Sequence, residues 1–283
     1  MDTKPLQPIG FFDSGIGGLT VLRAIHQLMP DEPLIYLADQ AHVPYGPRPM
    51  QEVRQFSEAI TRYLLNQGSR LIVVACNTAS AAALKYLRQV FPEIPFVGME
   101  PAVKPAAEHT RSGVVGVLAT PATFQGELYA SVVERFGQGV KLLQHTCPGL
   151  VAQIEDGALE SKTTIKILED AIQPMLEQGI DTIVLGCTHY PFVIPLIQHI
   201  TGPDVRVIDP APAVARQVQR LLVASSLLDL EAPLPHEIVK KPLNMQHFFT
   251  TGSPTKLERM LPALLGEIFP VEGLSWSAGK IKD

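Results

Sequence analysis

LIVVACNTAS at Leu71–Ser80 and TIVLGCTHYP at Thr182–Pro191 are the two stretches that decide the predicted fold. Each begins with a run of apolar and β-branched residues, which is typical of a buried strand. Each run leads into a cysteine, Cys76 or Cys187, followed by polar residues and an expected helix. A strand, a cysteine and a helix therefore occur twice in the same order, which favours two similar halves.

The same alternation extends through most of the chain. Strands are expected at 9–12, 34–38, 71–75, 96–99, 114–118, 140–144, 182–185 and 205–208, and helices at 19–29, 50–66, 79–90, 124–135, 163–178 and 213–225. Strands that alternate with helices predict βαβ units, a parallel sheet and helices on both of its faces. IGFFDSG and GVLATPAT form a second matching pair, in which Ser14 corresponds to Thr120. We expect an α/β fold of two similar doubly wound parallel-sheet domains related by pseudo-symmetry, with the active site in the cleft between them.

Breaks in this pattern predict the domain boundaries. MEPAVKPA interrupts it near Gly98–Pro105, and DPAPA interrupts it again near Asp209–Pro212. The first domain is therefore expected to comprise residues 1–98 and 212–283, and the second residues 99–211. After Leu230 a proline-rich loop is predicted, followed by one more strand and helix that return to the first domain.

Composition excludes several classes of protein. With 283 residues, the chain is long enough for about two domains of roughly 150 residues. Its apolar fraction of 46% is in the globular range and its charged fraction of 18% lies below the usual value of about 25%, and together these values exclude intrinsic disorder. The net charge of −5 and the scattered basic residues indicate no nucleic-acid partner. No segment approaches a membrane span and the first residues lack an apolar core, so no membrane partner and a cytoplasmic location are expected.

Cys76 and Cys187 are the candidate reactive groups. Both follow buried strands, so both are expected at the carboxyl edge of a parallel sheet, where ligands bind. Free N–H groups at the start of a following helix favour thiolate over thiol. Buried structural cysteines are the alternative, although Asn77-Thr78 and Thr188-His189 give each sulfur a polar setting. Cys147 lies in the HTCPG turn, without a strand context equivalent to that of the other two, and is assigned to structure. All three cysteines are expected to be free thiols.

Three further segments bear on the site. In DSGIGG, Asp13-Ser14 and the backbone N–H groups after them are placed to orient an ammonium group, shift a nearby thiol or hold a carboxylate or phosphate, while the alternative for Asp13 is a helix N-cap. The Gly run does not fit a dinucleotide fingerprint. Tyr45-Gly46 lies between prolines, which suits either a pocket wall or an ordinary surface loop. Glu155 is predicted to end an exposed helix.

Neither a metal nor an organic cofactor is expected. His145, Cys147, Cys187 and His189 are suitable zinc ligands by type, but their spacing is not that of a zinc site. A pyridoxal-phosphate racemase would need a Schiff-base lysine at a strand end beside a phosphate cup, and no lysine has that placement.

FDSGIGG at 12–18, PYG at 44–46, ACNTAS at 75–80 and GCTHYP at 186–191 together closely resemble the cofactor-independent glutamate racemases. The resemblance covers nearly the whole chain and weakens after about Leu230. It implies that Cys76 and Cys187 carry protons, and that substrate glutamate is bound by Asp13, Ser14, Tyr45, Gly46, Asn77, Thr78, Thr188 and His189. It also implies a role in making D-glutamate for bacterial peptidoglycan. Such proteins are often dimers, and only some of them are activated by a metabolite. The resemblance therefore allows a homodimer and a metabolite activator as partners without deciding either. Glu155 matches a further acidic residue only loosely and is left outside the predicted site.

Two other functions remain to be separated from this one. A related racemase acting on aspartate would keep both thiols, although the residues after each cysteine favour glutamate. In a non-catalytic ligand-binding α/β protein, the two thiols would have no chemical role. The expected positions of the two cysteines at matching sheet edges disfavour this alternative.

Overall fold

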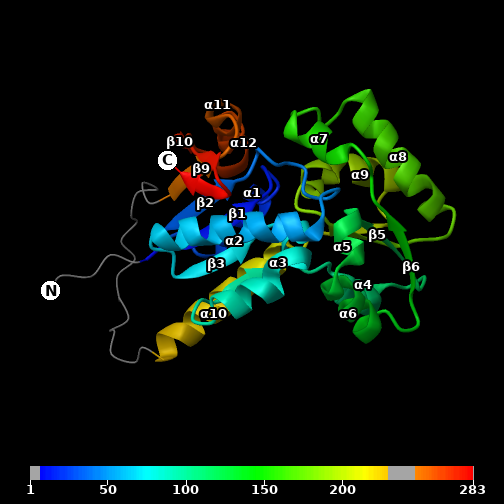
Figure 1. Cartoon of the computed structure of the whole chain (residues 1–283). Coiled ribbons are helices and arrows are strands. Elements are labelled where there is room, and N and C mark those ends of the chain that lie inside the picture. The colour runs from blue at the N-terminus through cyan, green and yellow to red at the C-terminus, as the bar shows by residue number, and fades with distance from the viewer. Residues whose placement is uncertain (1–6, 229–245, 283) are drawn as a thin grey trace.

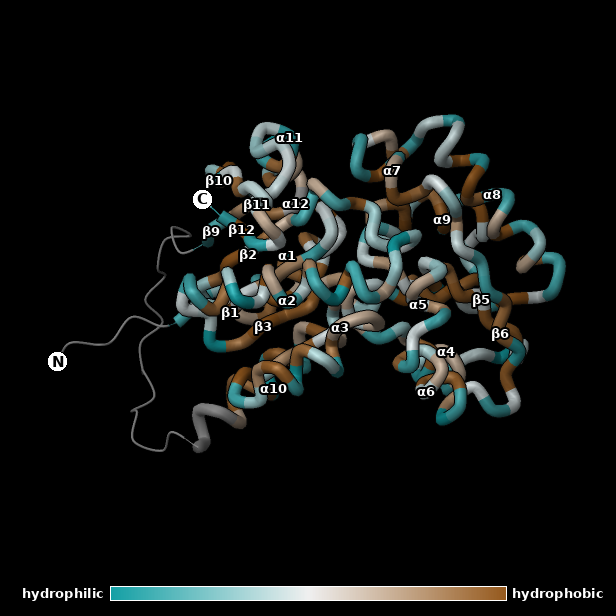
Figure 2. The backbone as a smooth tube through the Cα atoms, in the orientation of Figure 1, coloured by the Kyte–Doolittle hydropathy of each residue, from teal (hydrophilic) through white to brown (hydrophobic). Residues whose placement is uncertain are grey.

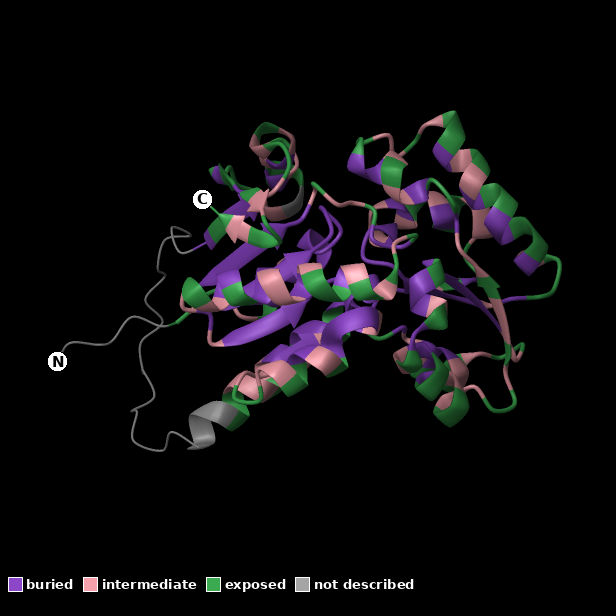
Figure 3. Ribbon diagram, viewed as in Figure 1, coloured by how far each residue is buried: buried purple, intermediate pink, exposed green. Residues whose placement is uncertain are grey.

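The computed structural model describes residues 7–228 and 246–282, and it shows two lobes that each contain a parallel sheet (Figure 1). Buried residues concentrate on the strands of both lobes, whereas the outer faces of the helices are exposed and hydrophilic (Figures 2 and 3). Among the described residues, no helix has both the length and the apolar character that a membrane crossing requires.

The first sheet has six strands in the order β10-β9-β2-β1-β3-β4, and all its strand pairs are parallel. Its strands are β1 (Ile9–Asp13), β2 (Leu34–Ala38), β3 (Leu71–Val74), β4 (Phe96–Gly98), β9 (Gln246–Thr250) and β10 (Val271–Gly273). The two strands β1 and β3 are completely buried, as expected for central strands of a parallel sheet covered on both faces. The polar segments that follow them therefore meet at one edge of the sheet.

The second sheet repeats the central part of the first. It comprises β5 (Val114–Ala119), β6 (Lys141–His145), β7 (Thr182–Gly186) and β8 (Arg206–Ile208) in the order β6-β5-β7-β8. This order has the same pattern as β2-β1-β3-β4, with parallel pairing throughout. The predicted fold class, with two pseudo-symmetric α/β domains, is therefore confirmed.

Alternate residues of β1 face opposite layers of helices, as the two-residue period of a strand requires. Phe11 packs in the cluster that contains residues of α1 (Leu19–Leu28) and α10 (Ala211–Leu228). Phe12 packs in a second cluster with α2 (Met50–Asn66) and α3 (Asn77–Val90). The remaining helices are α4 (Val103–His109), α5 (Pro121–Gln125), α6 (Glu127–Phe136), α7 (Leu150–Glu155), α8 (Lys162–Leu176), the 3₁₀ helix η1 (Tyr190–Val193), α9 (Ile194–Thr201), α11 (Pro254–Glu258) and α12 (Leu261–Leu265).

The structure differs from the sequence prediction at several elements. The helix expected at 124–135 is two helices, because the chain is extended at Gly126 between α5 and α6. The segment expected to form only a boundary near 98–105 also begins α4. Beyond residue 245 the chain forms more than one strand and helix: it contains β9, α11, α12 and β10, then a hairpin of β11 (Ser275–Ser277) and β12 (Lys280–Lys282). The predicted proline-rich loop lies mainly outside the described residues.

The chain passes between the two sheets twice. Strands from residues 9–98 and 246–273 form the first sheet, whereas strands from 114–208 form the second. We therefore propose that the division predicted from the sequence, residues 1–98 with 212–283 and residues 99–211, describes the two domains.

Gly126 marks a close approach between the lobes. A Cβ atom at this position would lie 2.7 Å from the Cβ of Ala81 in α3, and the φ angle of −74° is ordinary for any residue. Steric contact, and not backbone conformation, therefore requires glycine here.

We predict that Gly126→Ala lowers the free energy of unfolding by about 1–3 kcal/mol, because α3 and the α5–α6 junction must move apart. The double variant with Ala81→Gly should recover part of this loss, although Ala81→Gly alone costs about 1 kcal/mol in helix propensity. Urea unfolding of the four proteins measures the coupling. Additive losses would show that the two positions do not oppose each other across this contact.

Candidate active site

Both candidate cysteines line one enclosed pocket between the lobes. Cys76 follows β3 and Cys187 follows β7, so the matching edges of the two sheets face each other. The pocket is lined by Ser14, Pro44, Tyr45, Gly46, Cys76, Asn77, Thr78, Thr120, Val151, Cys187 and Thr188. The space in it that is open to the centre of a water-sized sphere is about 10 Å³, roughly what one water molecule needs. The sequence prediction placed eight of these residues together.

Cys76 caps the helix that follows it. Its Sγ accepts a hydrogen bond from the Ala79 backbone N–H at 3.5 Å, and its S–H donates to Ser14 Oγ at 3.9 Å. Burial is the main cause that raises the pKa of Cys76 well above its ordinary value, and the Asp13 carboxylate raises it further. The Ala79 N–H at the helix N-terminus lowers the pKa of Cys76, in the direction that the sequence predicted, but desolvation outweighs this one donor.

Asp13 lies behind Ser14 and does not line the pocket. Its Oδ2 accepts a hydrogen bond from the Gly18 N–H at 2.7 Å, at the start of α1, so Asp13 stabilises this helix terminus. Burial raises the pKa of the Asp13 carboxyl despite the opposing influence of His189. Both roles that the sequence left open for Asp13 are therefore present. Its carboxylate accepts a hydrogen bond at the start of α1, and its charge raises the pKa of Cys76.

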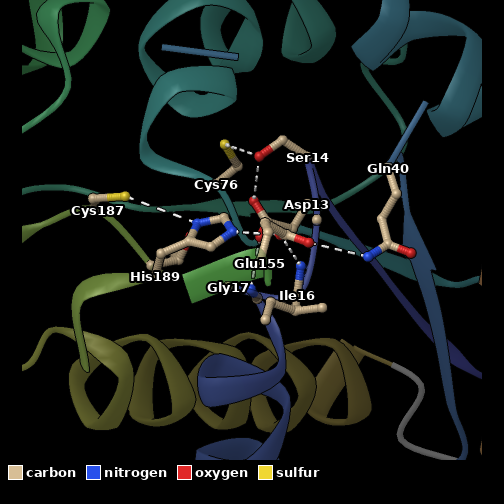
Figure 4. Close-up of polar contacts among 12 residues, drawn as sticks. Asp13, Ser14, Ile16, Gly17, Gln40, Cys76, Glu155, Cys187 and His189 are labelled. Atoms are coloured by element: carbon tan, nitrogen blue, oxygen red, sulfur yellow. Dashed lines mark hydrogen bonds and ion pairs between the residues drawn. The ribbon is translucent and has the colours of Figure 1, made fainter. Parts of the chain in front are cut away.

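Cys187 lies beside a buried ion pair (Figure 4). His189 Nδ1 is 3.9 Å from Cys187 Sγ, and His189 Nε2 is 2.7 Å from Glu155 Oε1. Burial lowers the pKa of His189, but its contacts with Cys187 and Glu155 prevail and raise that pKa well above the ordinary value. Burial raises the pKa of Glu155, but its hydrogen bonds to His189 and other donors prevail and lower it. Both directions favour an imidazolium paired with a carboxylate.

The prediction that Glu155 ends an exposed helix was wrong: Glu155 does end α7, but the residue is only 5% exposed. Oε1 also accepts the backbone N–H of Ile16 at 2.8 Å, and Oε2 accepts Gln40 Nε2 at 3.1 Å. The sequence predicted that backbone N–H groups of the turn after β1 would hold a carboxylate or phosphate. In the structure, the Ile16 N–H of this turn binds the carboxylate of Glu155.

Two glycines of this turn make room for the second lobe. A Cβ at Gly15 would lie 1.8 Å from Glu155 Oε1. A Cβ at Gly17 would lie 2.6 Å from His189 Nδ1 and 2.7 Å from Thr188 Oγ1. The Gly run in DSGIGG is therefore explained by packing against Glu155, Thr188 and His189, and not by binding a nucleotide.

The opposite side of the pocket offers polar groups to a ligand. The Asn77 side chain is buried, and neither its Oδ1 nor its Nδ2 has a hydrogen-bond partner. Thr78 Oγ1 is 2.8 Å from Thr120 Oγ1, so a hydroxyl pair joins the two lobes. An unpartnered buried amide is costly unless a ligand satisfies it, which makes Asn77 a candidate binding group in this cavity.

Sequence reasoning missed Thr120 as a lining residue, although the internal repeat that matches it with Ser14 contained the signal. It also missed Pro44 and Val151, for which the sequence offered no separate signal.

Cys147 lies outside this pocket and is buried. Its Sγ is 3.6 Å from His145 Nδ1, and burial raises the pKa of Cys147 to about 12. Within residues 7–228 and 246–282, no three His, Cys, Asp or Glu side chains are grouped so that they would hold a metal ion.

Comparison with known proteins agrees with this geometry. The model of the Asp/Glu/Hydantoin racemase family matches residues 17–218. A glutamate racemase from Roseiflexus sp. is 54% identical over 228 residues, which is 81% of this chain and 84% of the relative. The crystal structure of glutamate racemase isoform RacE1 from Bacillus anthracis has a TM-score of 0.80 and 32% identity, covering 97% of this chain and 98% of that one.

The structure of Escherichia coli glutamate racemase in complex with L-glutamate and the activator UDP-MurNAc-ala is also similar. It has a TM-score of 0.78 and 30% identity, covering 95% of this chain and 98% of that one. On the extent of these matches, the chain belongs to the Asp/Glu/Hydantoin racemase family and is a member of its glutamate racemase group.

Proposed function

We propose that the protein interconverts L-glutamate and D-glutamate by a cofactor-independent mechanism with two bases, Cys76 and Cys187. The observation that carries this proposal is that both thiols line one pocket from matching edges of two facing sheets. Racemisation removes a proton from one face of Cα and returns a proton to the other. Two groups that approach a substrate from opposite lobes meet this requirement directly.

The proton balance assigns one role to each thiol in each direction. With D-glutamate, the Cys76 thiolate takes the α-proton, and the Cys187 thiol gives its proton to the opposite face. The products are L-glutamate, a Cys76 thiol and a Cys187 thiolate. With L-glutamate, Cys187 is the base and Cys76 the acid. The active enzyme therefore carries one thiol and one thiolate at the start of each turnover.

Stabilisation of the carbanion is the main energetic task, since an α-proton is far less acidic than a thiol. Asn77 offers an unpartnered amide, and Thr78 and Thr188 add hydroxyl groups at the same pocket. Fixed donors in a site without bulk water lose little energy to reorganisation as charge develops. We assign these three residues, with Ser14 and Tyr45-Gly46, to binding the substrate.

Asp13 and His189 act through the thiols. Asp13 lies beside Ser14 and Cys76 and is placed to receive the Cys76 proton or to orient the substrate ammonium group. His189 holds a proton 3.9 Å from Cys187 Sγ, and Glu155 fixes the orientation of its ring. The two thiols thus have different neighbouring groups: a carboxyl group lies beside Cys76, and an imidazolium lies beside Cys187.

The closed pocket requires the lobes to separate before glutamate binds, because the space in it that is open to the centre of a water-sized sphere is about 10 Å³. We place the enzyme in the cytoplasm, where free thiols persist, and propose that its D-glutamate supplies peptidoglycan synthesis. A homodimer and activation by a metabolite stay predictions for this chain.

The purified protein, treated with a chelator and supplied with no pyridoxal phosphate or nucleotide, should remove the circular dichroism of either L- or D-glutamate. Cys76→Ala and Cys187→Ala should each lower the racemisation rate by about 10³-fold or more, because neither face can be served by the other thiol. Cys147→Ala is the matched control and should retain racemisation.

Decay of the optical signal with aspartate but not with glutamate would contradict the substrate assignment. Full racemisation by Cys187→Ala would contradict the assignment of the second base.

The Glu155–His189 pair should stabilise the fold in a defined pH range. The lowered pKa of Glu155 contributes stability above the ordinary value of 4.5, and this contribution is lost as the pH falls through the lowered value. The raised pKa of His189 contributes stability below the ordinary value of 6.5, and this is lost as the pH rises through the raised value. Both contributions are complete between pH 4.5 and 6.5.

Glu155→Gln should therefore lower the free energy of unfolding by about 3 kcal/mol in that range, and by less above it. Urea unfolding at a series of pH values measures this. Glu127→Gln, which removes a carboxylate from an exposed pair with Lys85, is the control and should change little. A loss that is the same at every pH would mean that Glu155 does not act through a charged His189.

A further inference from the structure

Asp39 is a fully buried carboxylate that lies outside the pocket and accepts hydrogen bonds from four side chains. The Tyr45 hydroxyl donates to Oδ2 at 2.6 Å, and His42 Nδ1 is 2.9 Å from the same oxygen. Thr251 Oγ1 and Trp276 Nε1 each donate to Oδ1 at 2.7 Å. An ionised carboxylate has about four acceptor sites, so this group of donors satisfies it.

The four donors come from distant parts of the chain. His42 and Tyr45 belong to the loop between β2 and α2, Thr251 follows β9, and Trp276 belongs to the β11–β12 hairpin. Asp39 itself directly follows β2. This one carboxylate therefore joins the C-terminal hairpin to the loop that forms a wall of the pocket.

Aromatic contacts also hold this loop. The His42 ring stacks on Phe56 of α2 with centroids 3.9 Å apart, and Trp276 meets the edge of His42 at 5.0 Å. The Tyr45 ring is 5.7 Å from Phe56. These contacts restrict the loop, and within the described part of the chain the hydrogen bond to Asp39 is the one that fixes the Tyr45 hydroxyl.

We propose that Asp39 is a positioning residue for glutamate binding, which acts by fixing Tyr45 and the adjoining Pro44–Gly46 wall. This inference rests on the proposed function. Gly46 has no room for displacement toward the second lobe, since a Cβ there would lie 3.0 Å from Thr120 Cβ. A shift of the wall thus changes the space next to Asn77 and Thr78. The hydrogen bonds of the two thiols are made with Ser14, Ala79 and His189, which lie outside this wall.

The inference predicts a change in binding without a matching change in chemistry. Asp39→Asn should raise KM for both enantiomers by about tenfold, because an amide cannot accept hydrogen bonds from all four donors. The value of kcat should change by less than about threefold, because the substitution does not touch either proton carrier. Tyr45→Phe, which removes only the hydroxyl, should act in the same way. The double variant should resemble either single variant, because both changes break the same bond.

Ser57→Ala is the matched control. It removes a buried hydroxyl that donates to the Val53 carbonyl within α2, so it should affect stability and leave KM unchanged. Trp276→Phe keeps an aromatic ring but removes one donor to Asp39, and it provides a milder variant if Asp39→Asn fails to fold. It should raise KM in the same direction as Asp39→Asn, by a smaller factor.

Calorimetric titration with glutamate gives Kd for every variant independently of turnover. A fall in kcat at constant KM, or effects of Asp39→Asn and Tyr45→Phe that multiply in the double variant, would overturn the positioning role. If the wild type binds glutamate without racemising it, the proposed function fails, and the Kd values still decide the role of Asp39. A wild type that does not bind glutamate would overturn both.

Discussion

The buried contact between Glu155 and His189 is the interaction on which the rest of the site depends. Glu155 ends α7 in the second lobe, yet it accepts hydrogen bonds from Ile16 and Gln40 in the first. Its Oε1 is also 2.7 Å from His189, which places the imidazole beside Cys187. Burying a carboxylate costs several kcal/mol unless it is paired and hydrogen-bonded. These donors meet that requirement only when the two lobes are in contact.

The same requirement explains the turn after β1. Gly15 and Gly17 leave space for Glu155 and His189, whose atoms would overlap a Cβ at either position. Asp13, in the same segment, binds the start of α1 and raises the pKa of Cys76. One short stretch thus receives the ion pair of the second lobe and sets the electrostatics of the thiol in the first. The closed arrangement is consistent with a reaction that needs little water and fixed donors.

The fold was largely predictable from the sequence because its signals are local. Buried strands such as β3 and β7 are short apolar runs, and these two runs, each leading into a cysteine, indicated the repeat. The burial of Glu155 was not predictable, because its partners Ile16 and Gln40 lie more than a hundred residues away. The high pKa of Cys76 was also missed, since desolvation depends on packing and not on the neighbouring helix alone. Asp39 gave no sequence signal, because its donors come from segments far apart along the chain.

The central claim is that two opposed sulfur groups, each able to hold only one proton, serve the two faces of the substrate. The most direct measurement is hydrogen exchange at Cα in D₂O, starting from pure D-glutamate and separately from pure L-glutamate. The account predicts that deuterium enters the product enantiomer first, while the recovered substrate stays unlabelled, because the base that removes the proton is not the acid that supplies the deuteron. Equal early labelling of both enantiomers would contradict it and indicate a single polyprotic base.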